Sequence, residues 1–263
     1  MTEEEKREAK LIYTLQRKLR QAIEKYGLIQ DGDKILIGLS GGKDSLALVE
    51  LLGERQKIFK PQFSVMAAHI SVSNIGYQSD LDYLRGHCEK HNVPFLSRTT
   101  SFDESTDKRK THCFLCSWHR RKALFELAKE LGCNKIALGH HQDDILQTLV
   151  MNLLFQGSFS TMPPLLKMDK FDMQIIRPLA LMKESEIKEL EAIRQYKKQN
   201  KNCPFEQESN RDDIKRLMAE MERIAPDMRN SLWNAMTNIQ SDYLPKDRPE
   251  IKQKKRIPFS PKE

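Results

Sequence analysis

The sequence predicts an α/β fold: a parallel, twisted sheet with helices on both faces, preceded by an N-terminal helix and followed by a C-terminal helical extension. The first observation behind this prediction is that short apolar runs alternate with segments of helical periodicity between residues 31 and 180, the order that builds parallel sheets. The second is a glycine turn that joins the first apolar run to the first helical segment. Ligands of such sheets bind beyond the carboxyl ends of the strands, so functional residues are expected there.

The N-terminal segment, residues 1–30, is predicted to contain one helix over residues 3–26. Its apolar side chains recur at helical spacing and form one stripe, and Gly27 is a suitable residue to end the helix. The stripe consists of Leu11, Ile12, Leu15, Leu19, Ile23 and Tyr26.

Residues 31–180 are predicted to form the α/β domain. Short apolar runs predict strands, at residues 35–39, 63–70, 94–98 and 135–138. Apolar residues at helical spacing predict the helices between and after them, at residues 45–52, 81–88, 113–131 and 144–155. Two further runs are split by charged residues and predict a hairpin, at residues 165–168 and 173–177.

The chain changes character after residue 180. The segment 181–244 is predicted to be a helical region, with helices at residues 183–197, 211–224 and 227–240. The tail, residues 245–263, is basic, contains several prolines and has few apolar residues. That composition is typical of a flexible segment, and we expect the tail to be flexible.

The size and charge of the chain limit the classes of function that it can have. The 263 residues are 39% apolar and 31% charged, enough for one large or two small domains with a real core. The net charge of +7 favours a polyanionic partner, with nucleic acid first, although charge alone fits a solvated basic surface equally well. No apolar run approaches the ~20 residues of a membrane span, and the first residues do not resemble a signal peptide. We therefore expect a cytoplasmic protein without a membrane partner, whose five cysteines are reduced, metal-bound or catalytic.

The glycine turn is the first candidate site. Residues Ser40–Ser45 read Ser-Gly-Gly-Lys-Asp-Ser and lie between a predicted strand and a predicted helix. Glycines let the backbone approach an anion closely, and the helix start offers free N–H groups, so the turn is predicted to bind phosphate. It is not of the Walker type, because Gly38 is one residue too close to Gly42 and Asp44 follows the lysine. An ordinary strand-to-helix turn is the alternative.

A Cys-x-x-Cys segment, Cys113 and Cys116, is the second candidate site. A spacing of three places both sulfurs on one helix face, and a helix start lowers the pKa of a thiol. The pair alone fits half of a zinc site, a thiol–disulfide pair or two core cysteines. Together with Cys203 it fits three ligands of a [4Fe–4S] cluster with one open iron, or zinc with a solvent ligand. Cys88 and Cys133 are expected to be structural, because helix packing explains them.

Two polar clusters complete the candidates. The basic run after the cysteines, residues 119–122, includes Arg120 and is expected either to be solvated or to contact a nucleotide or nucleic-acid phosphates. The segment Gly139–Asp144 follows a predicted strand and ends in Asp143 and Asp144. Adjacent carboxylates facing a phosphate loop fit Mg²⁺ binding or orientation of a nucleophile, although one of them could instead cap the next helix. The roles of His140 and His141 are left open.

These residues resemble a known family. The turn Ser40–Ser45 resembles the PP-loop of the N-type ATP pyrophosphatases, enzymes of the adenine nucleotide α-hydrolase-like fold that cleave ATP between the α and β phosphates. Further segments make the resemblance more specific: the whole chain from about residue 10 to 244 is similar to the tRNA 2-thiocytidine synthetases, a branch of the tRNA thiolases. These segments are Cys113–Cys116, Leu138–Thr148, Met162–Pro164 and Ile176–Leu179.

The resemblance implies an ATP-dependent replacement of the C2 oxygen of cytidine 32 in tRNA by sulfur, through an adenylated intermediate. It implies a [4Fe–4S] cluster held by Cys113, Cys116 and Cys203, which holds the sulfide, with ATP and Mg²⁺ as further cofactors. The implied catalytic residues are Asp44, Asp143, Asp144 and Arg120. The implied nucleotide-binding residues are Ser40, Gly41, Gly42, Lys43, Asp44, Ser45, His69 and Gly139. The implied partners are tRNA, a sulfur donor (a cysteine desulfurase or sulfide) and a second copy of the chain.

The chain departs from the family pattern at two places. Trp118 stands where the family often has a basic residue, and Cys203 lacks the second cysteine that some members carry nearby. The terminal cysteine pairs of the related 2-thiouridine enzymes are absent, which argues against that branch. A thiolase acting on a tRNA uridine and a non-catalytic nucleic-acid-binding metalloprotein are the alternative hypotheses.

Overall fold

The computed structural model describes residues 2–74, 79–102, 112–168, 172–197 and 210–245. The described chain divides into two compact units, residues 1–143 with 163–207 and residues 144–162 with 208–263. Within the described residues, no helix combines the length and the apolar character needed to cross a membrane.

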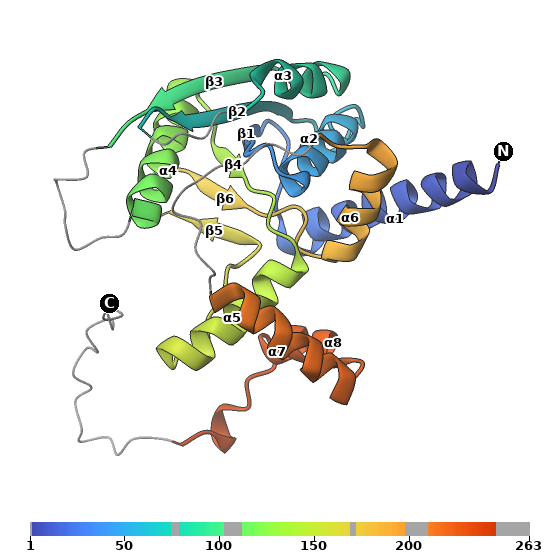
Figure 1. The fold of residues 1–263 in the computed structure, drawn as a ribbon, viewed down its shortest axis with the longest axis vertical. Helices are drawn as coiled ribbons and strands as arrows, with labels where there is room; N and C mark the ends of the chain where they lie inside the picture. The colour runs from blue at the N-terminus through green and yellow to red at the C-terminus, as the bar shows by residue number, and fades with distance from the viewer. Residues whose placement is uncertain (1, 75–78, 103–111, 169–171, 198–209, 246–263) are drawn as a thin grey trace. The chain divides into compact units, whose positions relative to one another are not determined.

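The first unit contains a six-stranded sheet in the order β3-β2-β1-β4-β6-β5 (Figure 1). All neighbouring strands are parallel except β5 and β6, which form the antiparallel hairpin predicted from the sequence. The strands are β1 (Lys34–Gly38), β2 (Ser64–Val72), β3 (Phe95–Thr100), β4 (Lys135–Ala137), β5 (Leu165–Lys167) and β6 (Gln174–Ile176).

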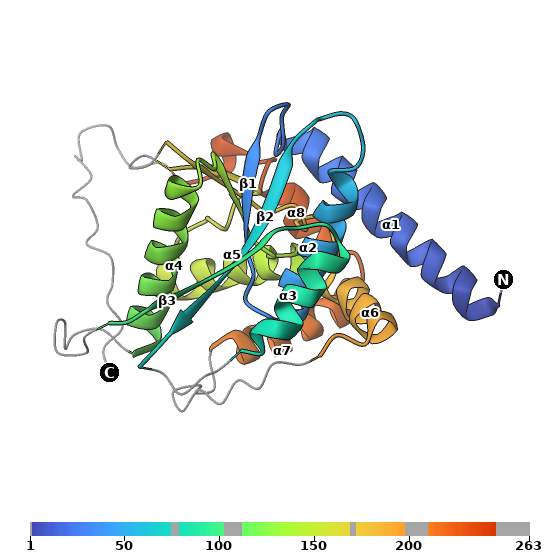
Figure 2. The same ribbon diagram turned by 90° about the horizontal axis from the view of Figure 1, so that it is seen from above.

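Helices cover both faces of this sheet, as predicted (Figures 1 and 2). The helix α4 lies on one face, and four helices lie on the other. The helices of the first unit are α1 (Glu3–Tyr26), α2 (Lys43–Arg55), α3 (Leu81–Lys90), α4 (His112–Glu130) and α6 (Glu184–Arg194).

The alternation of β1 explains the two-sided packing. Ile35 and Ile37 belong to the large core formed with α1, α2 and α6, whereas Leu36 belongs to a separate core formed with α4. Successive side chains of a strand point to opposite faces, so one apolar run contributes to both cores. The N-terminal helix buries its predicted stripe in the larger core and ends at Gly27, which has a left-handed φ of 61°.

The second unit is helical. It contains most of α5 (Gln142–Gln156) together with α7 (Asn210–Ile224), α8 (Met228–Ala235) and a short 3₁₀ turn, Ser241–Tyr243. Its core is built from apolar side chains of α5, α7 and α8, with Leu146 and Ile214 almost fully buried.

Two predicted helices end earlier than expected. The helix predicted at 183–197 is α6, which stops at Arg194 because Gln195 adopts a left-handed φ of 51°. The helix predicted at 227–240 is α8, which ends at Ala235; the Thr237 hydroxyl donates to the carbonyl of Asn234 at 3.2 Å there. Such side-chain bonds compete with helix continuation. The predictions for Cys203 and for most of the tail fall outside the described residues.

Candidate functional site

The glycine turn is shaped by a hydrogen-bonded serine. The Ser45 hydroxyl donates to the Gly42 carbonyl at 2.9 Å and accepts from the Gly41 N–H at 3.2 Å, and its oxygen lies 3.1 Å from that of Ser40. Gly41 has a φ of 85°, a conformation that side chains rarely adopt. The turn leads into α2, whose N-cap residue Gly42 offers no side-chain cap. The start of α2 therefore presents backbone N–H groups in a curved, preorganised loop suited to an anion.

Two neighbouring strands hold this loop from either side. His69 on β2 is only 1% exposed, and its Nδ1 lies 2.7 Å from the carbonyl oxygen of Leu39, just before the loop. Gly139, after β4, packs so closely that a Cβ there would lie 3.0 Å from the backbone of Asp44. Both residues were predicted to bind nucleotide; the buried geometry of His69 supports positioning of the loop.

A charged network includes two residues of the loop itself, Lys43 and Asp44. The Lys43 ammonium lies 3.0 Å from a carboxylate oxygen of Asp44 and 3.4 Å from one of Glu184. On its other side, Asp44 lies 3.6 Å from Nε2 of His141. The Nδ1 of His141 lies 3.9 Å from the carboxylate of Asp143. These residues come from the starts of α2 and α6 and from the segment after β4.

The network keeps Lys43 charged. Burial lowers the pKa of Lys43, but the carboxylates of Asp44 and Glu184 outweigh burial, and the pKa is raised above its ordinary value. A lysine at the start of a phosphate-binding loop acts as a cation, so this environment suits the binding of a polyphosphate.

The two adjacent aspartates have different surroundings. Asp143 is 5% exposed, and its carboxylate accepts a 2.8 Å hydrogen bond from the backbone N–H of Glu184, the first residue of α6. The helix that it caps is thus α6, whose N-terminal dipole favours a carboxylate. Asp144 is the first residue of the second unit, where its carbonyl accepts a hydrogen bond from the Thr148 hydroxyl at 2.7 Å. The first unit therefore brings together Lys43, Asp44 and Asp143, and Asp144 is outside that set.

A buried arginine joins two of the sequence segments singled out above. Arg177 is 6% exposed, and its guanidinium donates to the Pro163 carbonyl at 2.5 Å and to Nδ1 of His140 at 3.3 Å. Its backbone N–H donates to the carbonyl of Pro164 at 2.8 Å. Burial lowers the pKa of Arg177. Arg177 thereby fixes the segment after β4 against the residues that precede β5.

The Cys-x-x-Cys segment occupies the first turn and a half of α4. Cys113 is exposed and Cys116 is half-buried, packed against a small core of Val72, Phe102 and Leu115. Because Val72 ends β2, the cysteines lie at the carboxyl ends of the strands, the same edge as the glycine loop. The pKa of His69 is lowered mainly by burial, against the effect of its bond to Leu39, and further by the positive charge of Arg120. Arg120 lies on the same helix, four residues after Cys116.

Two of the other cysteines are buried, which agrees with the structural role predicted for them. Cys88 and Cys133 are buried in the two cores of the first unit. Burial raises the pKa of Cys88 to about 12 and also raises the pKa of Cys133. Thiols of that kind do not supply thiolate ligands at neutral pH.

The side chains around the loop suit a Mg²⁺ ion, which needs few protein ligands, better than a metal ion whose ligands all come from the protein. Among the described residues, no group of three or more His, Cys, Asp or Glu side chains is arranged to hold a metal ion. Mg²⁺ commonly takes only one or two carboxylates and completes its shell with water and substrate phosphates. Asp44, whose side chain is 30% exposed beside the loop, fits that pattern.

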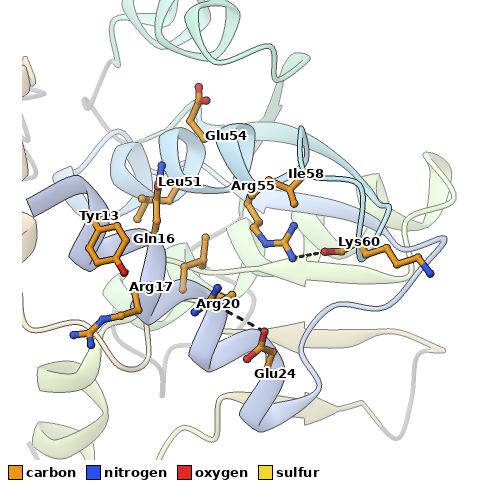
Figure 3. A pocket seen from close by; sticks show the side chains of 11 residues that line it. Tyr13, Gln16, Arg17, Arg20, Glu24, Leu51, Glu54, Arg55, Ile58 and Lys60 are labelled. Carbon is orange, nitrogen blue, oxygen red and sulfur yellow. Dashed lines mark hydrogen bonds and ion pairs between the residues drawn. The ribbon is translucent and has the colours of Figure 1, made fainter. Parts of the chain in front are cut away.

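A pocket elsewhere in the first unit is not part of this site. It lies between α1 and the C-terminal end of α2, has a volume of about 310 Å³, and includes Arg20, Glu24 and Arg55 in its lining (Figure 3). The glycine loop is at the opposite, N-terminal end of α2, ~20 Å away for a helix of this length.

The PP-loop domain family matches residues 11–231. The chain belongs to the PP-loop family. Within it, relatives over most of the chain are named tRNA-cytidine(32) 2-sulfurtransferase. The protein from Chromohalobacter salexigens is 35% identical over 240 residues, 89% of this chain and 84% of that protein. The protein from Pelobacter propionicus is 34% identical over 250 residues, 93% of this chain and 92% of that protein.

A solved structure of another protein is also similar. It is the U34-tRNA thiolase NcsA from Methanococcus maripaludis with its [4Fe-4S] cluster. The TM-score is 0.71 at 27% sequence identity, and the match covers 86% of this chain and 78% of that chain. The family and the fold predicted from the sequence are therefore confirmed.

Sequence reasoning missed part of this PP-loop site. Glu184 was not singled out, because nothing near it in the sequence distinguishes it from other surface glutamates of a predicted helix start. Arg177 was noted only within a segment, and His141 was left without a role. For Arg177 and His141 the available signal was that each lies within a segment that carried the resemblance, whereas Glu184 had no such signal.

Proposed function

We propose that this PP-loop protein is an ATP-dependent tRNA thiolase that replaces the C2 oxygen of cytidine 32 by sulfur. One observation carries the proposal: the phosphate-binding loop after β1 and the cysteines of α4 lie at the same edge of one sheet. ATP bound at the loop and sulfur held at the cysteines would then meet at one edge of the sheet. The chain is also 35% identical to a tRNA-cytidine(32) 2-sulfurtransferase.

The first step joins the base to AMP. The C2 oxygen of cytidine attacks the α phosphorus, a new P–O bond forms, and the bond between the α phosphorus and the bridging oxygen breaks to release pyrophosphate. In the proposal, Ser40–Ser45 bind the outgoing phosphates through backbone N–H groups, and Lys43 offsets their growing charge. Asp44 would hold Mg²⁺ with the Asp143 carboxylate nearby, and Asp144 keeps the catalytic role that the resemblance implies. His69 and Gly139 keep the loop in shape.

The second step exchanges oxygen for sulfur. Sulfide supplies the electron pair of a new C2–S bond, and the C2–O bond breaks, so that AMP leaves with the former base oxygen. No external electrons are needed when sulfur arrives as sulfide. Cys113, Cys116 and Cys203 would hold a [4Fe–4S] cluster, which would supply an iron without a protein ligand as a binding place for sulfide. Arg120, on the same helix as two of the cysteines, contacts the phosphate of the adenylated base.

The proposal includes further partners. The net charge of +7 supports binding of tRNA through its phosphates. Free sulfide supplies the sulfur directly, or a cysteine desulfurase supplies it as a persulfide that a thiol reductant converts to sulfide with two electrons. A second copy of the chain completes a homodimer.

Nucleoside analysis tests this function. Transfer RNA from a strain that lacks the gene is digested and examined by mass spectrometry, beside a strain complemented with the unaltered gene. Loss of 2-thiocytidine that complementation restores is the expected result. Unchanged 2-thiocytidine would overturn the proposal. Pyrophosphate release that depends on tRNA would in turn exclude a non-catalytic RNA-binding protein.

Thiolation of a tRNA uridine is the second candidate, favoured by the 0.71 TM-score to the U34-tRNA thiolase NcsA. The same nucleoside analysis separates the two, because loss of a thiouridine would replace loss of 2-thiocytidine. The cluster is tested separately with Cys203→Ala, purified without oxygen. Loss of iron, acid-labile sulfide and visible absorption is expected, and retention of all three would remove Cys203 from the ligand set.

A further inference from the structure

Two large aromatic side chains are exposed on the first turns of α4. Phe114 is 44% exposed and Trp118 is 46% exposed. Residues four apart lie on one face of a helix, so the two rings share a face. Lys122, a further turn along, places its Nζ 5.6 Å from the centre of the Trp118 ring. We call Phe114, Trp118, Arg121 and Lys122 the aromatic–basic face of α4.

The packing of α4 does not require this face. The buried residues of the helix are different ones, and the cores that cover the sheet contain them; they are Leu115, Ala123, Leu124, Leu127 and Ala128. Exposed apolar groups beside charged side chains often mark interaction sites. Both rings are outside the buried set of α4 and are partly exposed.

The indole ring is held in place although it is exposed. Its ring lies 4.8 Å from that of His119 in an edge-to-face arrangement, at an interplanar angle of 76°. His119 in turn stacks on Phe102 at 5.6 Å and 28°. Phe102 is 7% exposed and belongs to the core that includes Cys116 as a packed neighbour. A chain of aromatic contacts therefore connects Trp118 to the interior and limits its rotamers.

The aromatic–basic face adjoins the cysteines. Phe114 lies between Cys113 and Cys116 in the sequence, and Trp118 follows Cys116 by two residues. Cysteines three apart occupy one side of the helix, and residues 114 and 118 occupy the next side around. The rings therefore adjoin the cysteines on the surface of the helix.

We propose that Phe114 and Trp118 form a stacking platform for an unpaired base of the RNA substrate, while Arg121 and Lys122 contact the neighbouring phosphates. This inference rests on the proposed function. Unpaired bases stack on aromatic side chains, and such stacking tolerates any base because every base has a π face. The two adjacent cations suit a phosphate chain and favour RNA over an apolar protein segment. The platform recognises single-stranded character and holds a nucleotide that flanks the reacting one.

Tryptophan fluorescence tests the platform without turnover. The chain has two tryptophans, and Trp233, in the second unit, is removed by Trp233→Phe so that Trp118 is the remaining emitter. The protein is titrated with unmodified tRNA and, separately, with a fully paired RNA duplex of equal length. Strong quenching by tRNA and little by the duplex is expected. Equal quenching by both, or none by tRNA at saturation, would overturn the stacking proposal.

Kinetics supply the second measurement. Trp118→Ala is expected to raise the KM for tRNA by about 5- to 100-fold, the loss typical of one stacked base, with the Kd for ATP unchanged. Trp118→Phe restores most of the affinity. Phe155→Ala, at another exposed aromatic side chain (52% exposed), is the matched control and changes nothing. A KM within twofold for Trp118→Ala contradicts the platform.

The stacking platform and the proposed thiolase function can be disproved independently of each other. If the unaltered protein thiolates tRNA while Trp118→Ala keeps its KM, the platform is wrong and the proposed function stands. If tRNA quenches Trp118 but the unaltered protein forms no thiolated nucleoside, the platform stands and the proposed function is wrong.

Discussion

The Lys43 ammonium lies 3.4 Å from the carboxylate of Glu184, across from its own neighbour Asp44. Glu184 begins α6, and its backbone N–H donates to Asp143. One residue thus connects the lysine of the phosphate loop with an aspartate that follows β4. This contact joins segments that are far apart in the sequence and gives the site a definite geometry.

Removal of the Glu184 charge should change the pH dependence of ATP binding. Glu184 is one of two carboxylates that raise the pKa of Lys43 against burial. In Glu184→Gln the pKa of Lys43 falls, so the lysine loses its proton at a lower pH. The alkaline loss of ATP affinity should therefore begin at lower pH than in the unaltered protein. Isothermal titration from neutral pH to beyond 10.5, the ordinary lysine pKa, measures this.

The matched control for that experiment is Glu189→Gln. Glu189 is also on α6, but it pairs with Arg7 at the surface, with the nitrogen and oxygen 2.6 Å apart. Its loss should leave the pH profile of ATP binding unchanged. Coincident profiles for Glu184→Gln and the unaltered protein would show that Glu184 does not act on Lys43.

Charge on Lys43 itself should account for much of the ATP affinity. Hydrogen bonds to charged groups contribute about 1.5–3 kcal/mol, so Lys43→Met should weaken ATP binding by roughly 10- to 150-fold. Lys57→Met is the comparison, because Lys57 pairs with Glu54 at the surface, 2.8 Å away. An equal effect of the two substitutions on the Kd for ATP would contradict the role of Lys43.

Gly139 should be intolerant of even one added carbon. The Cβ of Gly139→Ala would lie 3.0 Å from the carbonyl group of Asp44 and 3.1 Å from the nitrogen of Ser45. Overpacking against backbone costs about 1–3 kcal/mol, and the displaced group is the start of α2. ATP binding should weaken by about tenfold or more, measured by titration, in a protein with an unchanged circular dichroism spectrum.

A glycine in an open place provides the contrast. A Cβ at Gly86, within α3, would have nothing within 4 Å. Gly86→Ala should leave ATP binding unchanged and raise the free energy of unfolding by up to about 1 kcal/mol, because alanine is the better helix former. Normal ATP affinity in Gly139→Ala would show that α2 moves to accept the extra carbon.

Local sequence patterns were sufficient to predict the fold, but they predicted much less of the candidate site. The strand β1 could be predicted because every residue from Ile35 to Leu39 except Gly38 is apolar, and the order of strands and helices then fixes a parallel sheet. The Ser40–Ser45 turn was also predictable from local sequence, because its glycines and serine act on the backbone next to them. These interactions are local, and their signals are adjacent in the sequence.

Contacts between distant segments had no such signal. Glu184 reaches Lys43 only because α6 starts beside the loop, and Arg177 reaches His140 only because β6 pairs with β4. Residue type alone did not distinguish Asp143, which is buried and caps α6, from Asp144, which begins the second unit. Strand pairing and helix docking decide these roles, and neither can be read from one stretch of sequence.

The cysteines should separate into two classes. Cys113→Ser and Cys116→Ser should lose iron and acid-labile sulfide in anaerobically purified protein, because each removes a proposed ligand from α4. Cys133→Ala is the matched control: that thiol is 5% exposed in a core, so its loss should reduce stability by about 1–2 kcal/mol and leave the iron content unchanged. Full iron content in Cys113→Ser would exclude Cys113 as a ligand.

The buried histidines should make the fold sensitive to mild acid. Burial lowers the pKa of His69, His87 and His91, and the hydrogen bonds and carboxylates that favour protonation do not outweigh it. The unfolded chain protonates its histidines near pH 6.5, whereas the folded chain does so only at lower pH. The unfolded state therefore binds more protons as pH falls below about 6.5, and the free energy of unfolding decreases there.

Urea denaturation at pH 8, 6.5 and 5.5 measures this decrease, at pH values above the range in which most carboxylates titrate. His87→Gln is the informative variant, because the ring Nε2 of His87 lies 3.0 Å from the Leu46 carbonyl and a glutamine amide can donate there without titrating. The variant should lose less stability between pH 8 and 5.5 than the unaltered protein. If both proteins lose the same free energy over that interval, protonation of His87 does not contribute to the acid sensitivity.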